Sequence, residues 1–360
     1  NKYLYSTSDD STLSIYDIGS KHTIKSIKVS HLALSSCCNG YDKQNNALIN
    51  IGSWDNTIYV YNRQLDSVVS KLKEHGDAIS CLTSDSTTNK LYSGSWDNTI
   101  KIWDNHSNKS LITYKIDSEL RCLSNCKIIQ PNIFISGDEN GNILMFDIRS
   151  NNNHKSIRSF RQAHKNQITS LSWLPNKFEF LSVSSDCNIK YWNGNGKLIY
   201  TVSTRENLTT IKNDGNLIIS GGELGHMRIW NLNDNNYKID EITKHSLISS
   251  SINSHSISSI AITNNSKHVF IGTKSFKDNI LVFELNKNKT KNNNNNVGNH
   301  TYINHDASKS DGNIIFREQI YKNDSDKPMW MVVRDKNKQN NKTIKTRPPP
   351  IPVKKSKSYD

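Results

Sequence analysis

The sequence lacks the cysteine pairs, long apolar runs and leader peptide of a secreted or membrane-spanning protein. Its 360 residues include six cysteines, and their spacing shows no disulfide framework, which predicts reduced thiols. No apolar run approaches the roughly 18 residues that a membrane span needs, and no signal-peptide pattern opens the chain. We therefore expect a cytoplasmic protein that meets membranes only indirectly. Since the first residue is Asn1 and not methionine, we also expect further residues upstream.

Sequence motifs of catalysis and metal binding are lacking as well. The stretch WNGNGK (192–197) does not have the spacing of a phosphate-binding loop. Cys122 and Cys126 stand four residues apart, but no second pair of Cys or His follows at zinc-binding spacing. No serine lies in a nucleophile-elbow motif. The sequence therefore predicts neither an enzyme nor a bound metal or cofactor.

The net charge of +13 is unevenly distributed along the chain. Between Asn286 and Asp360 there are 16 Lys and Arg against 7 Asp and Glu, so most of the excess belongs to this tail. No basic stripe runs through the first 285 residues, and a small dispersed charge is typical of an ordinary solvated surface. The charge of the folded part gives no indication of nucleic-acid binding.

One motif recurs seven times in the first 285 residues. Each copy has a short apolar run, a polar turn with Asp, Asn or Gly, and an alternating run that ends in an aromatic residue. This pattern predicts a strand, a tight turn and a second strand. In six copies the aromatic lies six residues after the turn residue, whereas in the seventh Asp278 is one residue out of step. The copies are residues 4–17, 48–62, 91–104, 133–147, 180–193, 217–231 and 269–283.

The repeat length predicts the fold. Successive aromatics lie 38 to 53 residues apart, and further strand-like runs such as 78–84 lie between the hairpins. Four strands per repeat of this length are typical of a β-propeller blade. We therefore predict an all-β, seven-bladed propeller over residues 1–285. Its first blade is incomplete, because the chain opens on a second strand. We expect upstream residues, or tail segment 313–321 or 329–333, to supply the missing first strand.

Two blades carry a more specific signature. The stretches GSWDNTIKIWD (94–104) and SSDCNIKYW (184–192), each preceded by a histidine, resemble the WD40-repeat family. The resemblance implies a buried hydrogen-bonded network of His, Asp, Trp and a strand hydroxyl in each blade. Since such a His–Asp pair recurs from blade to blade, a structural role is favoured over a catalytic one. The network residues are His75, Asp97 and Trp103 with Ser93 or Ser95, and His164, Asp186 and Trp192 with Ser182 or Ser184.

The signature is lost in other blades. Asn140 and Phe146 replace the turn Asp and the Trp in blade four, and Leu224 stands at the turn of blade six. His255 lies two residues from its expected place in blade seven. We therefore expect packing alone to hold these blades together.

The residue just before the turn position is expected at the rim of one propeller face, where a partner could bind. Tryptophan is unusual on an exposed turn and is a favoured anchor of binding hot spots. Two neighbouring blades carry it, so Trp54 and Trp96 should lie side by side with acidic residues at their edges. The alternative is that each indole only shields its own hairpin. The rim residues are Asp9, Trp54, Trp96, Glu139, Ser185, Glu223 and, in the slipped register, Phe276.

The composition changes at residue 286. Residues 286–346 are rich in Asn and Lys and are predicted to be disordered, with two strand-like islands at 313–321 and 329–333. Residues 347–360, RPPPIPVKKSKSYD, form a Pro-rich basic tail. Pro349, Pro352 and Lys354 have the PxxPx+ arrangement of an SH3 ligand, although a chance match explains so short a pattern equally well.

The second and third blades both read GSWDN (52–56 and 94–98) and are similar to the C-terminal propeller of BEACH-domain proteins of the FAN type. This resemblance implies a cytosolic scaffold, peripheral on vesicles, that binds other proteins in membrane trafficking or signalling. A WD40 adaptor of another complex, such as a ubiquitin-ligase substrate receptor or an RNA-processing protein, is an alternative. So is the targeting module of an enzyme whose catalytic part lies upstream. In each case we expect protein partners and no nucleic acid.

Overall fold

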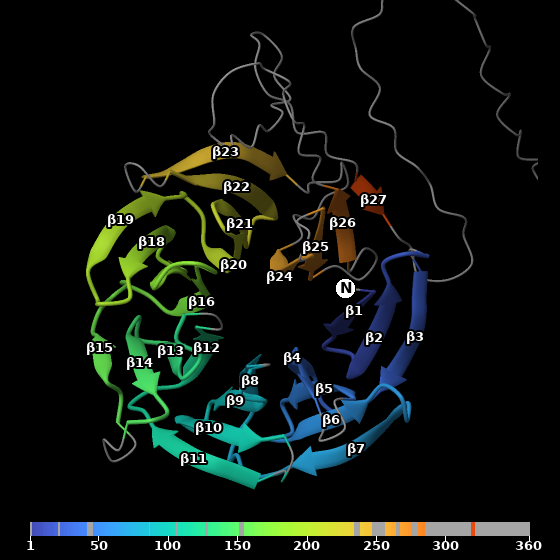
Figure 1. The fold of residues 1–360 in the computed structure, drawn as a ribbon. Helices are drawn as coiled ribbons and strands as arrows, with labels where there is room; N and C mark the ends of the chain where they lie inside the picture. The colour runs from blue at the N-terminus through green and yellow to red at the C-terminus, as the bar shows by residue number, and fades with distance from the viewer. Residues whose placement is uncertain are drawn as a thin grey trace, which may run out of the picture.

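The computed structural model shows a ring of seven β-sheets around one axis (Figure 1). It describes residues 2–284 and 318–320, except for 21, 42–45, 86, 106, 108, 127–128, 151–154, 234–237, 247–255, 264–266 and 275–279. No helix in this part of the chain is long and apolar enough to cross a membrane. The predicted all-β, seven-bladed propeller is confirmed.

Each blade is an antiparallel sheet in which strands consecutive in sequence are neighbours. Blade one has three strands and the other six have four. Blade one consists of β1 (Tyr3–Thr7), β2 (Thr12–Asp17) and β3 (His22–Lys28). Blade two consists of β4 (Leu34–Tyr41), β5 (Ala47–Ser53), β6 (Ile58–Asn62) and β7 (Ser67–Leu72). Blade three consists of β8 (Ile79–Asp85), β9 (Lys90–Ser95), β10 (Thr99–Asp104) and β11 (Lys109–Lys115).

The remaining blades follow in chain order around the ring. Blade four consists of β12 (Leu120–Asn125), β13 (Ile133–Asp138), β14 (Ile143–Asp147) and β15 (Arg158–Phe160). Blade five consists of β16 (Ile168–Trp173), β17 (Glu179–Ser184), β18 (Asn188–Asn193) and β19 (Leu198–Ser203). Blade six consists of β20 (Leu208–Asp214), β21 (Leu217–Gly222), β22 (His226–Asn233) and β23 (Lys238–Ser246). Blade seven consists of β24 (Ile257–Ile262), β25 (His268–Thr273), β26 (Ile280–Glu284) and β27 (Glu318–Ile320).

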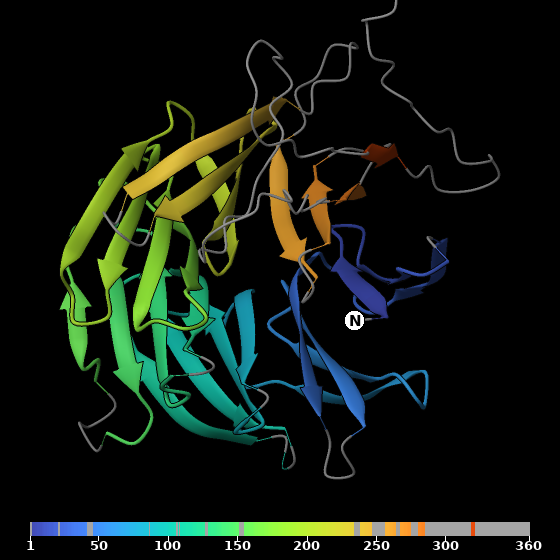
Figure 2. The same cartoon turned by 45° about the horizontal axis from the view of Figure 1, so that its top comes forward.

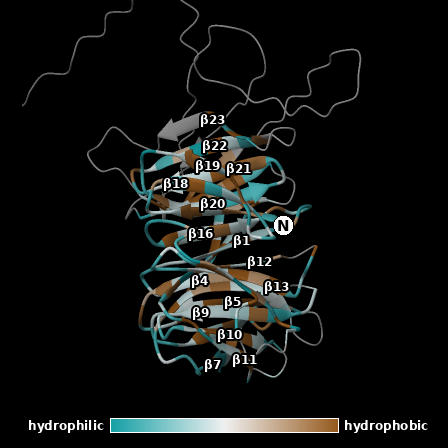
Figure 3. Cartoon of the chain, turned by 90° about the vertical axis from the view of Figure 1, so that its left-hand side faces the viewer, coloured by the Kyte–Doolittle hydropathy of each residue, from teal (hydrophilic) through white to brown (hydrophobic). Residues whose placement is uncertain are grey.

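Burial is greatest in the second strands of the blades and falls toward the outer strands. In β9, β13, β17 and β21, nearly every residue is buried, because adjacent blades cover both faces of the sheet. Outer strands such as β7 and β19 alternate between exposed and partly buried residues. Hydrophobic residues therefore gather in the strands and hydrophilic ones in the connections (Figure 3). The apolar runs of the sequence repeat are the parts that pack between blades.

The turn between the second and third strands has the same backbone form in six blades. In blades two to six the third residue after the second strand has a positive φ, and in blade one the fourth residue after β1 does, although the residue type varies. At Gly141 a Cβ would lie 2.3 Å from the His164 carbonyl oxygen, so only glycine fits there. The turn of blade six keeps this form even though Leu224 replaces the expected Asp. The six residues are Ser11, Asn56, Asn98, Gly141, Cys187 and Gly225.

The ring closes where blade seven meets blade one. The rings of Tyr16 and Phe270 are 6.2 Å apart and pack with Val282, so apolar contacts join the two blades. Residues 318–320 form β27 and pair with β26 at the outer edge of blade seven (Figure 2). Of the alternatives for the missing first strand of blade one, the one with segment 313–321 was therefore wrong, and 329–333 lies outside the described residues. The outer edge of β26 also offers free backbone groups, and β27 pairs with them there.

Candidate partner-binding face

Two kinds of connection meet on one side of the ring, which we call the turn face. One is the turn between the second and third strands of a blade, and the other is the loop that enters the blade. Backbone hydrogen bonds join them: the Trp54 N–H donates to the Ala33 carbonyl at 3.0 Å, and the Trp96 N–H to that of Ala78 at 3.1 Å. The rim residues expected from the sequence therefore sit beside the loops that connect neighbouring blades.

Blade three contains the expected buried network. His75 Nδ1 lies 2.9 Å from Asp97 Oδ2, and His75 Nε2 lies 2.7 Å from Ser93 Oγ. Because a carboxylate can only accept, the imidazole donates from Nδ1 and accepts the Ser93 hydroxyl at Nε2. The Trp103 indole then donates to Ser93 Oγ at 2.8 Å. Ser93 is the network hydroxyl, whereas Ser95 bonds to the Asp97 N–H in the turn.

Blade five repeats the same geometry. His164 Nδ1 lies 2.9 Å from Asp186 Oδ2, and its Nε2 lies 2.7 Å from Ser182 Oγ, which also accepts the Trp192 indole N–H at 2.8 Å. Burial lowers the pKa of His164, so the ring stays neutral more readily. Both histidine side chains are almost fully buried, and both ring nitrogens of each are occupied. The two networks are suited to holding loop and turn together.

Blade four is held by a different carboxylate, so the expectation of packing alone was wrong. Asp138 lies two residues before Asn140 and accepts hydrogen bonds from the Asn142 backbone N–H at 2.7 Å and the Ser118 hydroxyl at 2.6 Å. The Phe146 side chain has no N–H to donate, and the Ser136 hydroxyl, which is equivalent to Ser93, is buried without a partner.

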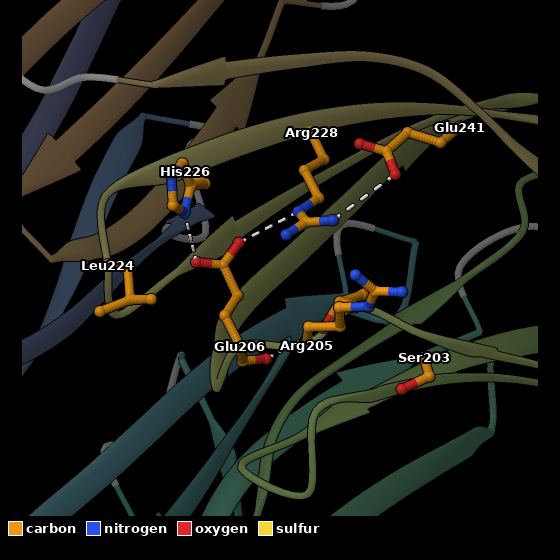
Figure 4. Close-up of a pocket in the computed structure, with 8 residues that line it drawn as sticks. Ser203, Arg205, Glu206, Leu224, His226, Arg228 and Glu241 are labelled. Carbon is orange, nitrogen blue, oxygen red and sulfur yellow. Dashed lines mark hydrogen bonds and ion pairs between the residues drawn. The ribbon is translucent and has the colours of Figure 1, made fainter.

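Blade six also has its own polar cluster, which again corrects the expectation. The carboxylate of Glu206, with a side chain only 1% exposed, comes from the entering loop. It lies 2.8 Å from His226 Nδ1 and accepts from Arg228 Nε at 3.1 Å, while Arg228 also reaches Glu241 at 3.5 Å (Figure 4). A Cβ on Gly222 would lie 2.6 Å from the Glu206 carboxyl carbon. Blades three and five have a serine at this position, so the glycine makes room for the carboxylate.

The same cluster lines a pocket of about 420 Å³ on the turn face. Leu224 is half-exposed at its edge, and Arg205 and Ser203 lie across from it (Figure 4). The carboxylates of Glu206 and Glu241 are already bonded to Arg228. The pocket therefore carries mixed charge, and its most buried groups satisfy one another.

Trp54 and Trp96 lie in contact on adjacent blades. Their ring centroids are 5.6 Å apart with an angle of 46° between the planes, and the Trp54 side chain is 46% exposed. Leu32, which is 51% exposed, belongs to the loop beside Trp54. Neither indole belongs to a buried network of the kind seen in blade three. We call Leu32, Trp54 and Trp96 the indole patch.

Arg121 connects the indole patch to blade four. Its guanidinium carbon lies 5.5 Å from the Trp96 ring centroid, and its Nη2 lies 3.3 Å from Glu139 and 3.6 Å from Glu119. The result is a continuous row of indole, indole, guanidinium and carboxylate across three blades. A cation over an aromatic face is attractive, which orients the Trp96 ring. Arg121, Glu119 and Leu32 were not among the sequence candidates, because nothing in the repeat marks loop and inner-strand residues as rim neighbours.

The other rim residues are dispersed around the turn face. Asp9 is exposed on blade one, and Ser185 bonds to Gln167 on blade five. Glu223 accepts from the Asn207 amide at 2.8 Å on blade six. In blade seven the Lys274 N–H donates to the Ser256 carbonyl, as the rim residue does in other blades. The structure therefore assigns this rim position to Lys274 and not to Phe276, which itself lies outside the described residues.

Charge is divided between the two halves of the turn face. In the described part of blades one to four, the exposed turns and loops are mainly acidic, and those of blades five to seven are mainly basic. The indole patch therefore lies in the acidic half. The exposed acidic residues include Asp9, Asp10, Asp77, Asp117 and Glu139, and the exposed basic ones Arg161, Lys165, Arg205 and Lys274.

Other sequence candidates lie in the core or outside the described residues. The Cys122 thiol is buried, which raises its pKa well above the ordinary value, and it lies 3.6 Å from the Ile168 carbonyl oxygen. Cys126 is also buried. In the part of the chain that the structure describes, no three His, Cys, Asp or Glu side chains gather as metal ligands. His255, Pro349, Pro352 and Lys354 lie outside the described residues.

Comparison with known proteins supports the assignment of the repeats. Residues 66–104 and 154–193 match the family described as WD domain, G-beta repeat. These segments contain the hairpins of blades three and five, which carry the complete networks. The solved structure of U3-55K shares the fold, with a TM-score of 0.65 at 14% identity over 76% of this chain and 85% of that one.

Among curated proteins, the CCR4-associated factor 4 homolog of Vanderwaltozyma polyspora is 30% identical over 145 residues, which is 36% of this chain and 21% of that protein. BEACH domain-containing protein B of Arabidopsis thaliana is 22% identical over 214 residues, which is 52% of this chain and 8% of that protein. The chain spans less than a quarter of the length of either relative. Two of its blades therefore match the WD-repeat model, and they stand in a ring of seven blades.

Proposed function

We propose that this propeller is a protein-interaction scaffold whose partner binds the turn face over blades two to four. The carrying observation is the indole patch, where the half-exposed Trp54 lies in contact with the partly buried Trp96 of the adjacent blade. Exposed tryptophan contributes heavily to binding, because its large apolar surface is released from water while few rotamers are lost. Arg121 and its two glutamates form the polar edge that typically surrounds such an anchor.

The chemistry of this half of the face favours one kind of partner. Its acidic side chains attract a segment with basic residues, and the indoles accept an aliphatic, aromatic or proline side chain. The same carboxylates repel phosphates, so nucleic acid is not the expected ligand of this region.

We further propose that the propeller itself performs no chemistry. The two His–Asp pairs are the groups most like catalytic dyads. Their imidazoles have both nitrogens engaged, by Asp97 and Ser93 in blade three and by Asp186 and Ser182 in blade five. A general base needs a nitrogen that can reach a substrate proton. These contacts support a structural role for both histidines.

For the wider context we propose a BEACH-type protein that acts in membrane trafficking or signalling, in the cytoplasm and peripheral on vesicles. Two repeated GSWDN turns and the partial similarity to BEACH domain-containing protein B support this. The second candidate is an adaptor in another complex, which the similarity to the CCR4-associated factor 4 homolog favours.

The test is affinity capture from an extract of the source cells, followed by quantitative mass spectrometry. Bait proteins are the full chain, Trp54→Ala, and the double variant Trp54→Ala with Trp96→Ala. Leu224→Ala is the matched control, because Leu224 is 50% exposed on the same face but lies in blade six. We expect the double variant to recover one set of proteins in amounts at least about tenfold lower than the wild type. Truncation of a hot spot costs about 1.4 kcal/mol or more of binding free energy, which is a tenfold change in Kd.

Circular dichroism and thermal unfolding show whether the variants remain folded. A folded double variant that recovers every wild-type partner would refute the binding site. Loss of trafficking proteins supports the BEACH-type context. Loss of ubiquitin-ligase or RNA-processing components instead supports an adaptor of another complex.

A further inference from the structure

We propose that the chain's own Pro-rich basic segment, residues 347–360, binds the indole patch in cis and competes with the partner. The inference rests on the proposed function, because both use the same patch. Three observations carry it: the shape and chemistry of the patch, the charge around it, and the length of chain that joins the segment to the ring.

The indole patch offers a stacking surface for proline. Trp96 contacts both the Trp54 ring and the Arg121 guanidinium, and these two contacts restrain its own ring. Trp54 stands at the outer end of this row and keeps nearly half of its side chain exposed. Proline-rich peptides bind grooves lined with aromatic rings, because their polyproline II form is already ordered and loses little entropy. The segment RPPPIPV supplies four prolines with Ile351 among them.

Charge complementarity selects this half of the turn face. The single positive charge of Arg121 lies beside two negative charges, those of Glu119 and Glu139. The loops next to Arg121 also expose Asp77 and Asp117. The tail segment carries four basic residues and a single Asp, at its last position. Over blades five to seven the exposed Lys and Arg would repel the same segment. Attraction between opposite surface charges therefore favours the indole patch over the rest of the face. The four basic residues are Arg347, Lys354, Lys355 and Lys357.

The connecting chain is long enough. β27 ends at Ile320 on blade seven, and residues 321–346 lie between it and the segment, a linker of 26 residues. A flexible chain of this length has a root-mean-square span of about 28 Å, and a fully extended one about 90 Å. Blade seven adjoins blade one, and blade two follows. Tethering of this kind gives an effective concentration on the order of 1 mM, so a Kd of roughly 0.1 mM leaves the patch mostly occupied.

The experiment uses the full chain labelled with 5-fluorotryptophan and observed by fluorine NMR. The chain has seven tryptophans, and the single variants Trp54→Phe and Trp96→Phe assign the two patch resonances. The test variant changes Pro349, Pro350 and Pro352 to Ala together. The matched control changes Lys336 and Lys338 to Ala, which alters tail charge outside the segment.

We expect the triple variant to shift the Trp54 and Trp96 resonances and to leave those of the buried Trp103 and Trp230 unchanged. The control should shift none of them. Adding a synthetic peptide of residues 347–360 to the triple variant should restore the wild-type positions in a saturable way. Unchanged Trp54 and Trp96 resonances in the triple variant would overturn the proposal, as would a peptide that has no effect.

Dilution separates binding within one chain from binding between chains. We expect the wild-type shifts to persist unchanged on tenfold dilution, and shifts that disappear would overturn binding in cis. The outcome is also separable from the proposed function. If the tail variant changes no resonance while Trp54→Ala still loses its partners, the scaffold role stands and the cis ligand does not. In partner capture, the triple variant should recover several-fold more of the proteins that Trp54→Ala loses.

Discussion

Two pairs of blades join the entering loop to the turn with different polar residues: blades three and five form the first pair, and blades four and six the second. In the first pair, a histidine of the entering loop meets an aspartate of the turn. In blade six the two partners change places, with the carboxylate of Glu206 in the loop and His226 on the strand after the turn. Blade four has no histidine in its network and uses Asp138 with a hydroxyl and an amide.

The comparison shows that a carboxylate is needed between loop and turn, and that the residue which supplies it can vary. Loop and turn leave backbone and side-chain donors close together beneath the surface, and blades three to six each place a carboxylate among them. Any carboxylate that reaches this place satisfies the donors, provided that the neighbouring position leaves room, as Gly222 does for Glu206. The repeat can therefore lose its signature residues and keep its turn geometry.

The largest effect should come from Glu206→Ala in blade six. It would leave the buried Arg228 with Glu241 alone and His226 without the Glu206 carboxylate, and removal of one partner of a buried ion pair costs about 3–5 kcal/mol. Urea unfolding measures the loss. The matched control is Glu223→Ala, an exposed glutamate of the same blade, which should change stability by less than about 0.5 kcal/mol. Equal small losses would show that packing, and not the carboxylate, holds blade six.

Blade three should lose less from His75→Ala. Asp97 keeps hydrogen bonds from the Gly76 and Thr99 backbone N–H groups, so the variant costs roughly 1–3 kcal/mol through the lost hydrogen bonds of the imidazole to Asp97 and Ser93. The same unfolding measurement applies. His31→Ala, an exposed histidine of the turn face, is the control and should have little effect. A loss as large as that of Glu206→Ala would contradict the distinction between the two networks.

The blade-five carboxylate should make stability fall in acid. Burial by itself raises the pKa of Asp186, but hydrogen bonds from His164 and the Lys165 N–H outweigh it and lower the pKa from 3.8 to about 2. As the pH falls, the unfolded chain binds this proton first. The contribution of up to roughly 2 kcal/mol is therefore present above pH 4 and lost between about pH 4 and pH 2.

Unfolding free energies of wild type and Asp186→Asn across this pH range measure that contribution. The variant cannot titrate at this position, so the difference between the two proteins should shrink as the solution is acidified. A difference that stays constant with pH would show that Asp186 is not held in its charged form by the network.

The smallest effect should come from Ser118→Ala in blade four. It removes one hydrogen bond to Asp138 while both Asn142 bonds remain, so we expect a loss of about 1 kcal/mol. Thermal unfolding should resolve this as a shift of a few degrees. An unchanged unfolding temperature would show that the Asn142 hydrogen bonds alone satisfy Asp138. Polar contacts between loop and turn would then contribute little to blade four.

Prediction from the sequence was most successful where the pattern is local. The spacing of apolar runs, turns and aromatics specifies strands and hairpins, and repetition of that pattern specifies seven blades. The two His–Asp networks could be predicted because their residues keep fixed offsets from the turn. The choice of Ser93 over Ser95 could not, since it depends on which hydroxyl faces both the imidazole and the indole.

Residues outside the signature positions of the repeat could not be predicted in the same way. Glu206 and Asp138 lie at positions where the repeat expects no carboxylate, so their pairing with His226 and Asn142 is visible only in three dimensions. Arg121 is an inner-strand residue, and its contact with Trp96 depends on the packing of blade four against blade three. Similarly, the role of residues 318–320 follows from the open edge of β26.

The sequence by itself determined the class of fold, the number of blades and the rim position of the two tryptophans, because strand periodicity and turn chemistry act over short distances. The tertiary structure decided which donors meet which carboxylates, how the indoles join Arg121 and the glutamates, and how charge divides the turn face. Those arrangements depend on side chains that a loop and a turn of one blade, or two neighbouring blades, bring together. His75 and Asp97 are 22 positions apart in the chain, and Trp54 and Trp96 belong to different blades, so both pairs come into contact only in the folded ring.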